Sequence, residues 1–197
     1  MSPDRIGELI ARNRAWAARR TAEDPEIFAR LARGQRPFCL WIGCSDSRVA
    51  PETIVDVGPG ALFVHRNVAN LVRPDDPNLL SVLEFGLGEL GIEEVVVCGH
   101  EGCGGVARAL EEPRGALVDD WLRPVRQLAR SRADELGRDG VAGDRLSRLV
   151  ALNVADQLHR LAGLPLVRRL RRSRPLRLHG LVFDIASGRL RRVATDP

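Results

Sequence analysis

The stretch "PFCLWIGCSDSR", residues 37–48, joins a short apolar run to a polar loop and decides how the chain folds. Similar apolar runs that end in Gly, Asn or a polar loop recur at 61–67 ("ALFVHRN") and at 93–99 ("EEVVVCG"). Runs of this length are typical of strands that are buried on both faces of a parallel sheet. We therefore expect these three strands to form the centre of an α/β sheet.

A helical pattern lies between the second and third of these strands. Its apolar residues share one helical face, and Gly91 ends it: Leu79, Val82, Leu83, Leu87 and Leu90. A strand, a helix and a strand in this order predict a right-handed crossover. Further helices are predicted at about 4–19, 25–34, 116–136, 144–162 and 165–172, and the chain closes with a predicted hairpin over 176–185 and 189–194.

The composition indicates one globular domain. A chain of 197 residues with 44% hydrophobic content can bury one substantial core. Neither the first residues nor any later run of 18 is apolar enough for a signal peptide or membrane anchor, so we expect a cytoplasmic location. The net charge is +4, but all 30 basic residues are arginine and 26 acidic residues are interspersed among them, which argues against nucleic-acid or membrane partners.

Four potential metal ligands follow two of the predicted strands. Cys44 and Asp46 come directly after the first strand, and His100 and Cys103 come after the third. Loops at the carboxyl ends of neighbouring parallel strands converge on one crevice, so these side chains can meet. Two thiolates and an imidazole, with a carboxylate or water as fourth partner, are a preferred ligand set for zinc.

Two other interpretations compete with this site. Cys39 and Cys98 repeat the spacing, but five residues of extended strand span roughly 17 Å, so they cannot share one zinc with the later cysteines. We expect them to be buried thiols. "GCGGVA" at 102–107 fits a dinucleotide-binding fingerprint, yet Asp119 and Asp120 lie in helix or loop and not at the end of a following strand.

Three motifs in this order, "CSDSRV", "FVHRNVAN" and "CGHEGCGG", resemble the β-class carbonic anhydrases. The resemblance extends from about "GQRP" to the final hairpin. It implies a three-layer α/β sandwich whose sheet has four parallel strands and an antiparallel edge strand. It also implies one domain with an N-terminal helical arm at 1–34 and a zinc-binding core at 35–197. The arm would embrace a second subunit in a dimer or a dimer of dimers, with active sites at the subunit interface.

By the same resemblance, Cys44, His100 and Cys103 hold one Zn²⁺ per chain, and Asp46 and Arg48 form a switchable pair. When Arg48 binds the Asp46 carboxylate, the fourth zinc position is left to water. When that pair breaks, Asp46 takes the position itself. One state is catalytic and the other is blocked.

The resemblance assigns further roles around the metal. Gln35 and the backbone amides of Gly104 and Gly105 would bind substrate oxygens.

Three histidines are candidates for relaying the proton, although such histidines are more often structural: His65, His159 and His179.

A bicarbonate effector site found in some family members is matched only in part. Trp41 and Arg66 stand at its first two positions, but Phe183 replaces a tyrosine at the third. The lost hydroxyl predicts weakened bicarbonate inhibition, because a buried polar partner left unmatched costs about 1–3 kcal/mol. The alternative is that Trp41 and Phe183 are ordinary core aromatics.

The expected reaction is the reversible hydration of carbon dioxide to bicarbonate and a proton, by attack of zinc-bound hydroxide that Asp46 orients. Two anionic thiolates weaken the acidity of the zinc, so activity should favour mildly alkaline pH. An alternative within the fold is hydrolysis of carbon disulfide or carbonyl sulfide on the same zinc centre. A different class of alternative is a non-catalytic zinc or nucleotide-binding module, which would not need the Asp46 and Arg48 pair.

Overall fold

The computed structural model describes residues 4–137 and 142–195. The chain divides into two compact units, Met1–Arg36 and Pro37–Pro197. The first unit contains α1 (Arg5–Glu23) and α2 (Ile27–Leu31), where the sequence predicts two helices. The second of these is shorter than its predicted range of 25–34.

Local contacts explain the first unit. The Asp4 carboxylate accepts a hydrogen bond from the Gly7 backbone N–H at 2.9 Å and so caps the start of α1. Trp16 of α1 packs edge-on against Phe28 of α2, with 5.7 Å between the ring centroids. The two helices therefore share a small aromatic contact.

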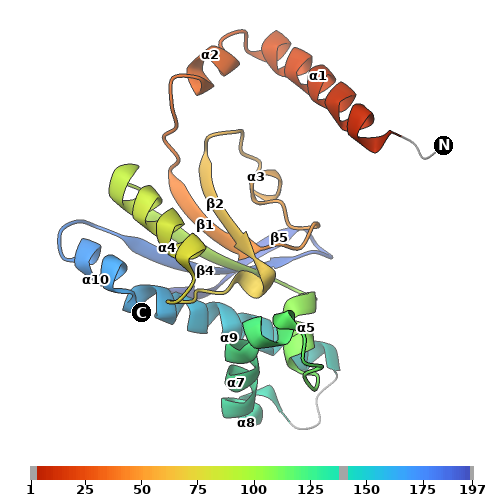
Figure 1. Cartoon of the computed structure of the whole chain (residues 1–197), viewed down its shortest axis with the longest axis vertical. Helices are drawn as coiled ribbons and strands as arrows, with labels where there is room; N and C mark the ends of the chain where they lie inside the picture. The colour runs from red at the N-terminus through yellow and green to blue at the C-terminus, as the bar shows by residue number, and fades with distance from the viewer. Residues whose placement is uncertain (1–3, 138–141, 196–197) are drawn as a thin grey trace. The chain divides into compact units, whose positions relative to one another are not determined.

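The second unit is built on a five-stranded sheet with the order β2-β1-β3-β4-β5 (Figure 1). Neighbouring strands pair in parallel, except that β5 runs antiparallel to β4. The strand bounds are β1 (Cys39–Cys44), β2 (Leu62–Asn67), β3 (Glu94–His100), β4 (Arg177–Asp184) and β5 (Arg189–Thr195). The predicted α/β fold with four parallel strands and one antiparallel edge strand is confirmed.

The helices of this unit follow the strands in chain order. They are α3 (Pro51–Ile54), α4 (Pro77–Leu83), α5 (Gly104–Ala109), α6 (Leu117–Trp121), α7 (Arg123–Ser131), α8 (Ala133–Leu136), α9 (Ala142–Gly163) and α10 (Pro165–Arg171). A 3₁₀ turn, η1 (Val68–Asn70), follows β2, and a π-helical turn, η2 (Glu84–Glu89), continues α4. The helix predicted over 116–136 is therefore three short helices. Pro124 contributes to the first break, because it has no N–H to donate to a carbonyl of the preceding turn and is tolerated in the first turn of α7.

Alternate residues of the central strands enter two separate cores. Leu40 and Val97 belong to the larger core, which includes residues from α4, α7 and α9. Trp41 and Cys98 point to the other face and belong to a smaller cluster against which Ile54 of α3 packs. The sheet centre is therefore buried on both faces, as its continuous apolar runs predict.

The strand predicted at 61–67 is not central. β2 lies at one edge of the sheet, and several of its residues are only partly buried. Phe63 of β2 stacks on Phe85 with 5.9 Å between ring centroids. This contact explains why β2 has an apolar sequence although several of its residues are only partly buried. The prediction of a central position was wrong because local hydrophobicity does not reveal strand order.

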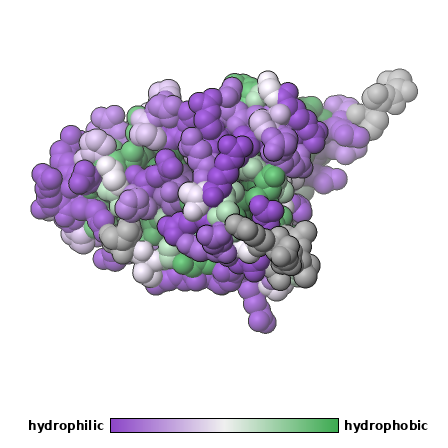
Figure 2. Space-filling view, turned by 90° about the horizontal axis from the view of Figure 1, so that it is seen from below, coloured by the Kyte–Doolittle hydropathy of each residue, from purple (hydrophilic) through white to green (hydrophobic). Residues whose placement is uncertain are grey.

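The surface is largely hydrophilic on the face shown in Figure 2, with apolar side chains scattered among polar ones. This pattern matches the interspersed arginines and acids of the sequence. Among the helices that the structure describes, none combines the length and apolarity needed to cross a membrane.

Candidate metal centre

Strand pairing brings the predicted metal ligands together. Cys44 is the last residue of β1 and His100 the last of β3, and these strands are parallel neighbours. Gly102 adopts φ 65°, a left-handed conformation that glycine accepts without strain, and Cys103 then directly precedes α5. The carboxyl ends of two strands and one tight turn therefore converge at this point.

The geometry of the three side chains fits a tetrahedral metal. Their ligand atoms all lie within 4.8 Å of one another, and the Sγ atoms of Cys44 and Cys103 are 3.9 Å apart. Two sulfurs that each lie about 2.3 Å from one tetrahedral zinc would be separated by about 3.8 Å. His100 is fully buried, yet its Nε2 makes no hydrogen bond of sound geometry within the described part of the chain. This donor set suits a divalent metal such as zinc.

The two thiols have unequal proton affinities. The hydrogen bond with Cys103 lowers the pKa of Cys44, and backbone N–H groups of Asp46 and Ala69 add to this effect. The same contact and burial raise the pKa of Cys103. Without a cation the pair therefore retains one proton, and a divalent cation bound to both sulfurs would displace it.

Asp46 and Arg48 form a bidentate ion pair beside the cluster. Arg48 donates from Nε to Asp46 Oδ1 at 2.9 Å and from Nη2 to Oδ2 at 2.7 Å. The Arg48 side chain thereby holds the pKa of Asp46 well below its usual range. Asp46 Oδ2 lies 3.7 Å from His100 Nε2, so the ionised carboxylate sits next to the ligand cluster while bound to Arg48.

Backbone carbonyls around the ligands are also held. Arg66 donates from Nε to the Cys44 carbonyl at 2.8 Å and from Nη2 to the Asp46 carbonyl at 2.6 Å. His100 Nδ1 lies 3.0 Å from the Glu101 carbonyl. Donation from Nδ1–H to that carbonyl fixes the tautomer that leaves Nε2 free for a metal. Nothing in the sequence motif distinguishes Glu101 for this role, because the contact uses its backbone.

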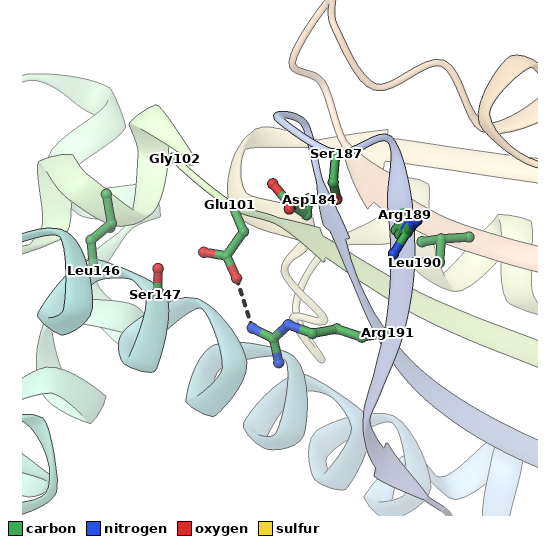
Figure 3. Close-up of a pocket in the computed structure, with 9 residues that line it drawn as sticks. All are labelled: Glu101, Gly102, Leu146, Ser147, Asp184, Ser187, Arg189, Leu190 and Arg191. Carbon is green, nitrogen blue, oxygen red and sulfur yellow. Dashed lines mark hydrogen bonds and ion pairs between the residues drawn. The ribbon is translucent and has the colours of Figure 1, made fainter.

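The side chain of Glu101 faces a separate cavity of about 640 Å³ (Figure 3). This cavity lies between the loop after β3, the start of α9 and the hairpin of β4 and β5. Arg191 of β5 donates to Glu101 Oε1 at 2.7 Å. This ion pair connects the hairpin of β4 and β5 to Glu101, the residue whose backbone carbonyl contacts His100.

The predicted effector residues occupy different surroundings. Trp41 and Phe183 are only 3% and 6% exposed and share the smaller apolar cluster. Trp41 Nε1 is buried without a hydrogen-bond partner in the described residues. Arg66 is engaged with the carbonyls of Cys44 and Asp46. A bicarbonate site at these residues stays a prediction.

The three candidate histidines lie outside the Cys–His–Cys cluster. His65 is buried, its Nε2 lies 3.1 Å from Asn67 Nδ2, and burial lowers its pKa. His179 Nε2 lies 2.7 Å from Oε2 of Glu94, the first residue of β3. His159 is exposed on α9. Their proposed role in proton relay stays a prediction.

The predicted substrate-binding residues fall in both units. Gln35 belongs to the first unit, and its role stays a prediction. Gly104 and Gly105 open α5 directly after Cys103. A Cβ on Gly105 would lie 2.8 Å from Val68 Cγ1 and 3.1 Å from Ala69 Cβ, so the start of α5 approaches η1 too closely for a larger residue.

Comparisons with known proteins agree with this geometry. A family model described as carbonic anhydrase matches residues 39–190. A carbonic anhydrase of Emericella nidulans is 38% identical over 190 residues, which cover 96% of this chain and 83% of that protein. A tetrameric β-carbonic anhydrase of Sordaria macrospora superposes with a TM-score of 0.95 at 38% identity, over 99% of this chain and 100% of that chain. The β-carbonic anhydrase of Coccomyxa, solved with acetazolamide, gives a TM-score of 0.92 at 34% identity, over 96% of this chain and 86% of that one.

Proposed function

The chain belongs to the β-class carbonic anhydrase family, and from this premise we propose that it hydrates carbon dioxide reversibly to bicarbonate and a proton, using one Zn²⁺ per chain. The observation that carries the proposal is the buried Nε2 of His100, which makes no hydrogen bond of sound geometry with any described residue and lies beside two cysteine sulfurs 3.9 Å apart. A bound Zn²⁺ would supply the Lewis acidity that activates a water molecule near neutral pH.

The three ligands set the character of this centre. Cys44, His100 and Cys103 would hold the ion from one side and leave one position for water or substrate. Because two of the ligands are anionic, they donate more charge than imidazoles would. Activity should therefore increase toward mildly alkaline pH.

Asp46 is the group we assign to orienting the attacking water. Its carboxylate is ionised, is held by Arg48, and lies 3.7 Å from His100 Nε2. A carboxylate in this position can accept a hydrogen bond from the water and direct its lone pair toward carbon dioxide. Arg48 positions Asp46, and loss of that pair would free Asp46 to block the open metal position.

We also propose that the chain self-associates as a dimer or a dimer of dimers. The similarity to a tetrameric enzyme over the whole chain supports this state. Large apolar side chains on the second unit are exposed and would gain from burial against another subunit: Val68, Phe85, Leu117 and Val118. Light scattering of the purified protein tests the oligomeric state directly.

The test of the activity is the initial rate of carbon dioxide hydration by zinc-quantified protein from pH 7 to pH 9. The proposal expects a rate that rises with pH and that disappears in a matched metal-free sample. A parallel assay with carbon disulfide tests the rival substrate. Hydrolysis of carbon disulfide by the zinc-loaded protein without any hydration of carbon dioxide would overturn the proposal.

A further inference from the structure

The turn that follows β2 has an unusual backbone. Ala69 adopts φ 66° and ψ 26°, and Asn70 adopts φ 48°, so two successive non-glycine residues are left-handed. Both are buried, with exposed fractions of 0% and 1%. Such conformations persist only where the surroundings enforce them, and they concentrate at functional sites.

This turn lies against the metal centre. The backbone N–H of Ala69 donates to the Sγ of Cys44. On its other side the turn meets the start of α5, where Gly105 leaves room for Val68 and Ala69. The left-handed backbone thus directs the Ala69 N–H toward Cys44. It also packs against the start of α5, the helix that directly follows Cys103.

Two buried amides of α9 hold the turn from a distance in the sequence. Asn153 Nδ2 donates to the Ala69 carbonyl at 3.0 Å, and Gln157 Oε1 accepts from the Val72 backbone N–H at 2.8 Å. Gln157 Nε2 also donates to Asn153 Oδ1 at 3.0 Å. Both side chains are 1% exposed, on a helix that otherwise packs apolar residues against β3 and β4 (Figure 1).

The rest of the turn is held equally firmly. The Asn67 side chain accepts from the Leu71 N–H at 2.7 Å and donates to the Leu71 carbonyl at 2.8 Å. Trp121 Nε1 donates to the Val68 carbonyl at 2.8 Å. Trp121 thus holds the peptide group that contains the Ala69 N–H, and Asn153 holds the next peptide group through the Ala69 carbonyl, so the two side chains together fix the left-handed conformation of Ala69.

We propose that Asn153, supported by Gln157, is a positioning residue for the metal centre: it fixes the turn that presents the Ala69 N–H to Cys44 Sγ. This inference rests on the proposed function, because it concerns a thiolate bound to metal. Donation from the amide withdraws charge from the sulfur and orients its lone pairs. Partners of this kind tune both the affinity and the electronic structure of a metal site.

The alternative is that the two amides only stabilise the fold. The two roles predict different results for metal spectroscopy, because a purely structural residue affects unfolding without changing the bonding between sulfur and metal. Asn153→Leu removes the donor and keeps a similar volume. Leu161→Ala is the matched control, because Leu161 is fully buried on the same helix and is not bonded to the turn.

The experiment replaces the metal with Co²⁺ in the full chain and records the sulfur-to-cobalt charge-transfer absorption, together with the rate of metal release to a chelator. We expect Asn153→Leu to shift this absorption and to release metal about tenfold faster than the parent. Leu161→Ala should lower the denaturation midpoint and leave both metal readouts unchanged. Gln157→Met should act in the same direction as Asn153→Leu with a smaller change, and it decides the question if Asn153→Leu does not fold.

The outcomes separate the two proposals. A folded Asn153→Leu or Gln157→Met protein with parent-like absorption and release would overturn the positioning role alone. A parent protein that takes up Co²⁺ without sulfur-to-cobalt absorption would overturn the proposed metal centre and this inference with it.

Discussion

Two pairs of cysteines in the second unit have the same separation but, among the described residues, only Cys44 and Cys103 cluster with His100. Cys39 and Cys98 lie within β1 and β3, and Cys44 and Cys103 lie five residues further along. All four thiols are buried to a similar degree. Burial raises the pKa of Cys39 and of Cys98 to about 12, whereas hydrogen bonding lowers the pKa of Cys44. Depth of burial therefore does not decide which cysteine can hold a metal.

The difference comes from where the strands end. Inside a sheet the backbone N–H groups are used by neighbouring strands. The Sγ atoms of Cys39 and Cys98 contact the carbonyls of Leu40 and Gly99 at 3.4 Å and 3.3 Å, and backbone hydrogen bonds from Val96 and Phe183 offset only part of the effect of burial on their pKa values. At the strand ends, the contact with Cys103 is the largest effect that lowers the pKa of Cys44, and His100 and the backbone N–H groups of Asp46 and Ala69 add to it.

The largest effect is expected when one cysteine of each pair is replaced by alanine and the zinc content of the two variants is compared. Cys103→Ala should lose zinc and, with it, nearly all activity, because two remaining ligands cannot hold the ion tightly. Cys98→Ala should keep the parent's zinc content and activity and lose only about 1 kcal/mol of stability for the removed buried group. Zinc analysis, hydration rates and denaturant unfolding of both variants measure this. Equal zinc loss in the two variants would contradict the comparison.

The second prediction concerns the acid beside the ligands. Asp46→Asn should keep its zinc and lose about 10²-fold or more in hydration rate, as expected when a positioned proton acceptor is removed. Asp75→Asn is a matched control, because Asp75 is also held by two hydrogen bonds from an arginine two residues away, Arg73. Stopped-flow rates decide the matter, and a fully active Asp46→Asn enzyme would refute the role of Asp46.

The third prediction uses the opposite pKa shifts in metal-free protein. Because its pKa is lowered, Cys44 should be a thiolate at neutral pH and become less reactive only as the pH falls through that pKa. Cys39 and Cys98, with pKa values of about 12, should stay protonated through pH 9. Iodoacetamide should modify Cys44 at least about tenfold faster, since the thiolate is the nucleophile. Peptide mass spectrometry measures this, and uniform labelling of all the cysteines in folded protein would argue against it.

The fold and the clustering of Cys44, His100 and Cys103 were predictable for local reasons. Apolar runs that end in polar loops mark β1 and β3, and parallel strands bring their carboxyl ends together whatever the residues between them. The edge position of β2 was not predictable, because strand order depends on pairing between distant segments. The breaks between α6, α7 and α8 were missed because their apolar spacing continues across them.

The residues that surround and position the metal centre could not be predicted from the sequence. Glu101 faces His100 through a backbone carbonyl, which any residue type supplies. Asn153 meets Ala69 across 84 residues of chain, and buried amides among the apolar residues of a helix do not reveal in the sequence which groups they bind. The left-handed turn at Ala69 and Asn70 contains no glycine to mark it.

The smallest expected effect lies in the cluster that contains Cys98. Phe183→Tyr adds a hydroxyl beside Trp41, whose Nε1 is buried without a partner among the described residues. If these residues form a bicarbonate site, inhibition by bicarbonate should strengthen about fivefold, the equivalent of one hydrogen bond of about 1 kcal/mol. Inhibition curves of parent and variant measure this. An unchanged response would identify Trp41 and Phe183 as core aromatics only.

We propose that Cys44 and Cys103, and not Cys39 and Cys98, make this chain an enzyme. The most direct measurement adds zinc stepwise to metal-free protein and follows carbon dioxide hydration, in the parent and in Cys98→Ala. We expect both activities to rise linearly with added zinc and to saturate at about one zinc per chain. Hydration that is independent of zinc, or a zinc-saturated parent with no hydration, would contradict it.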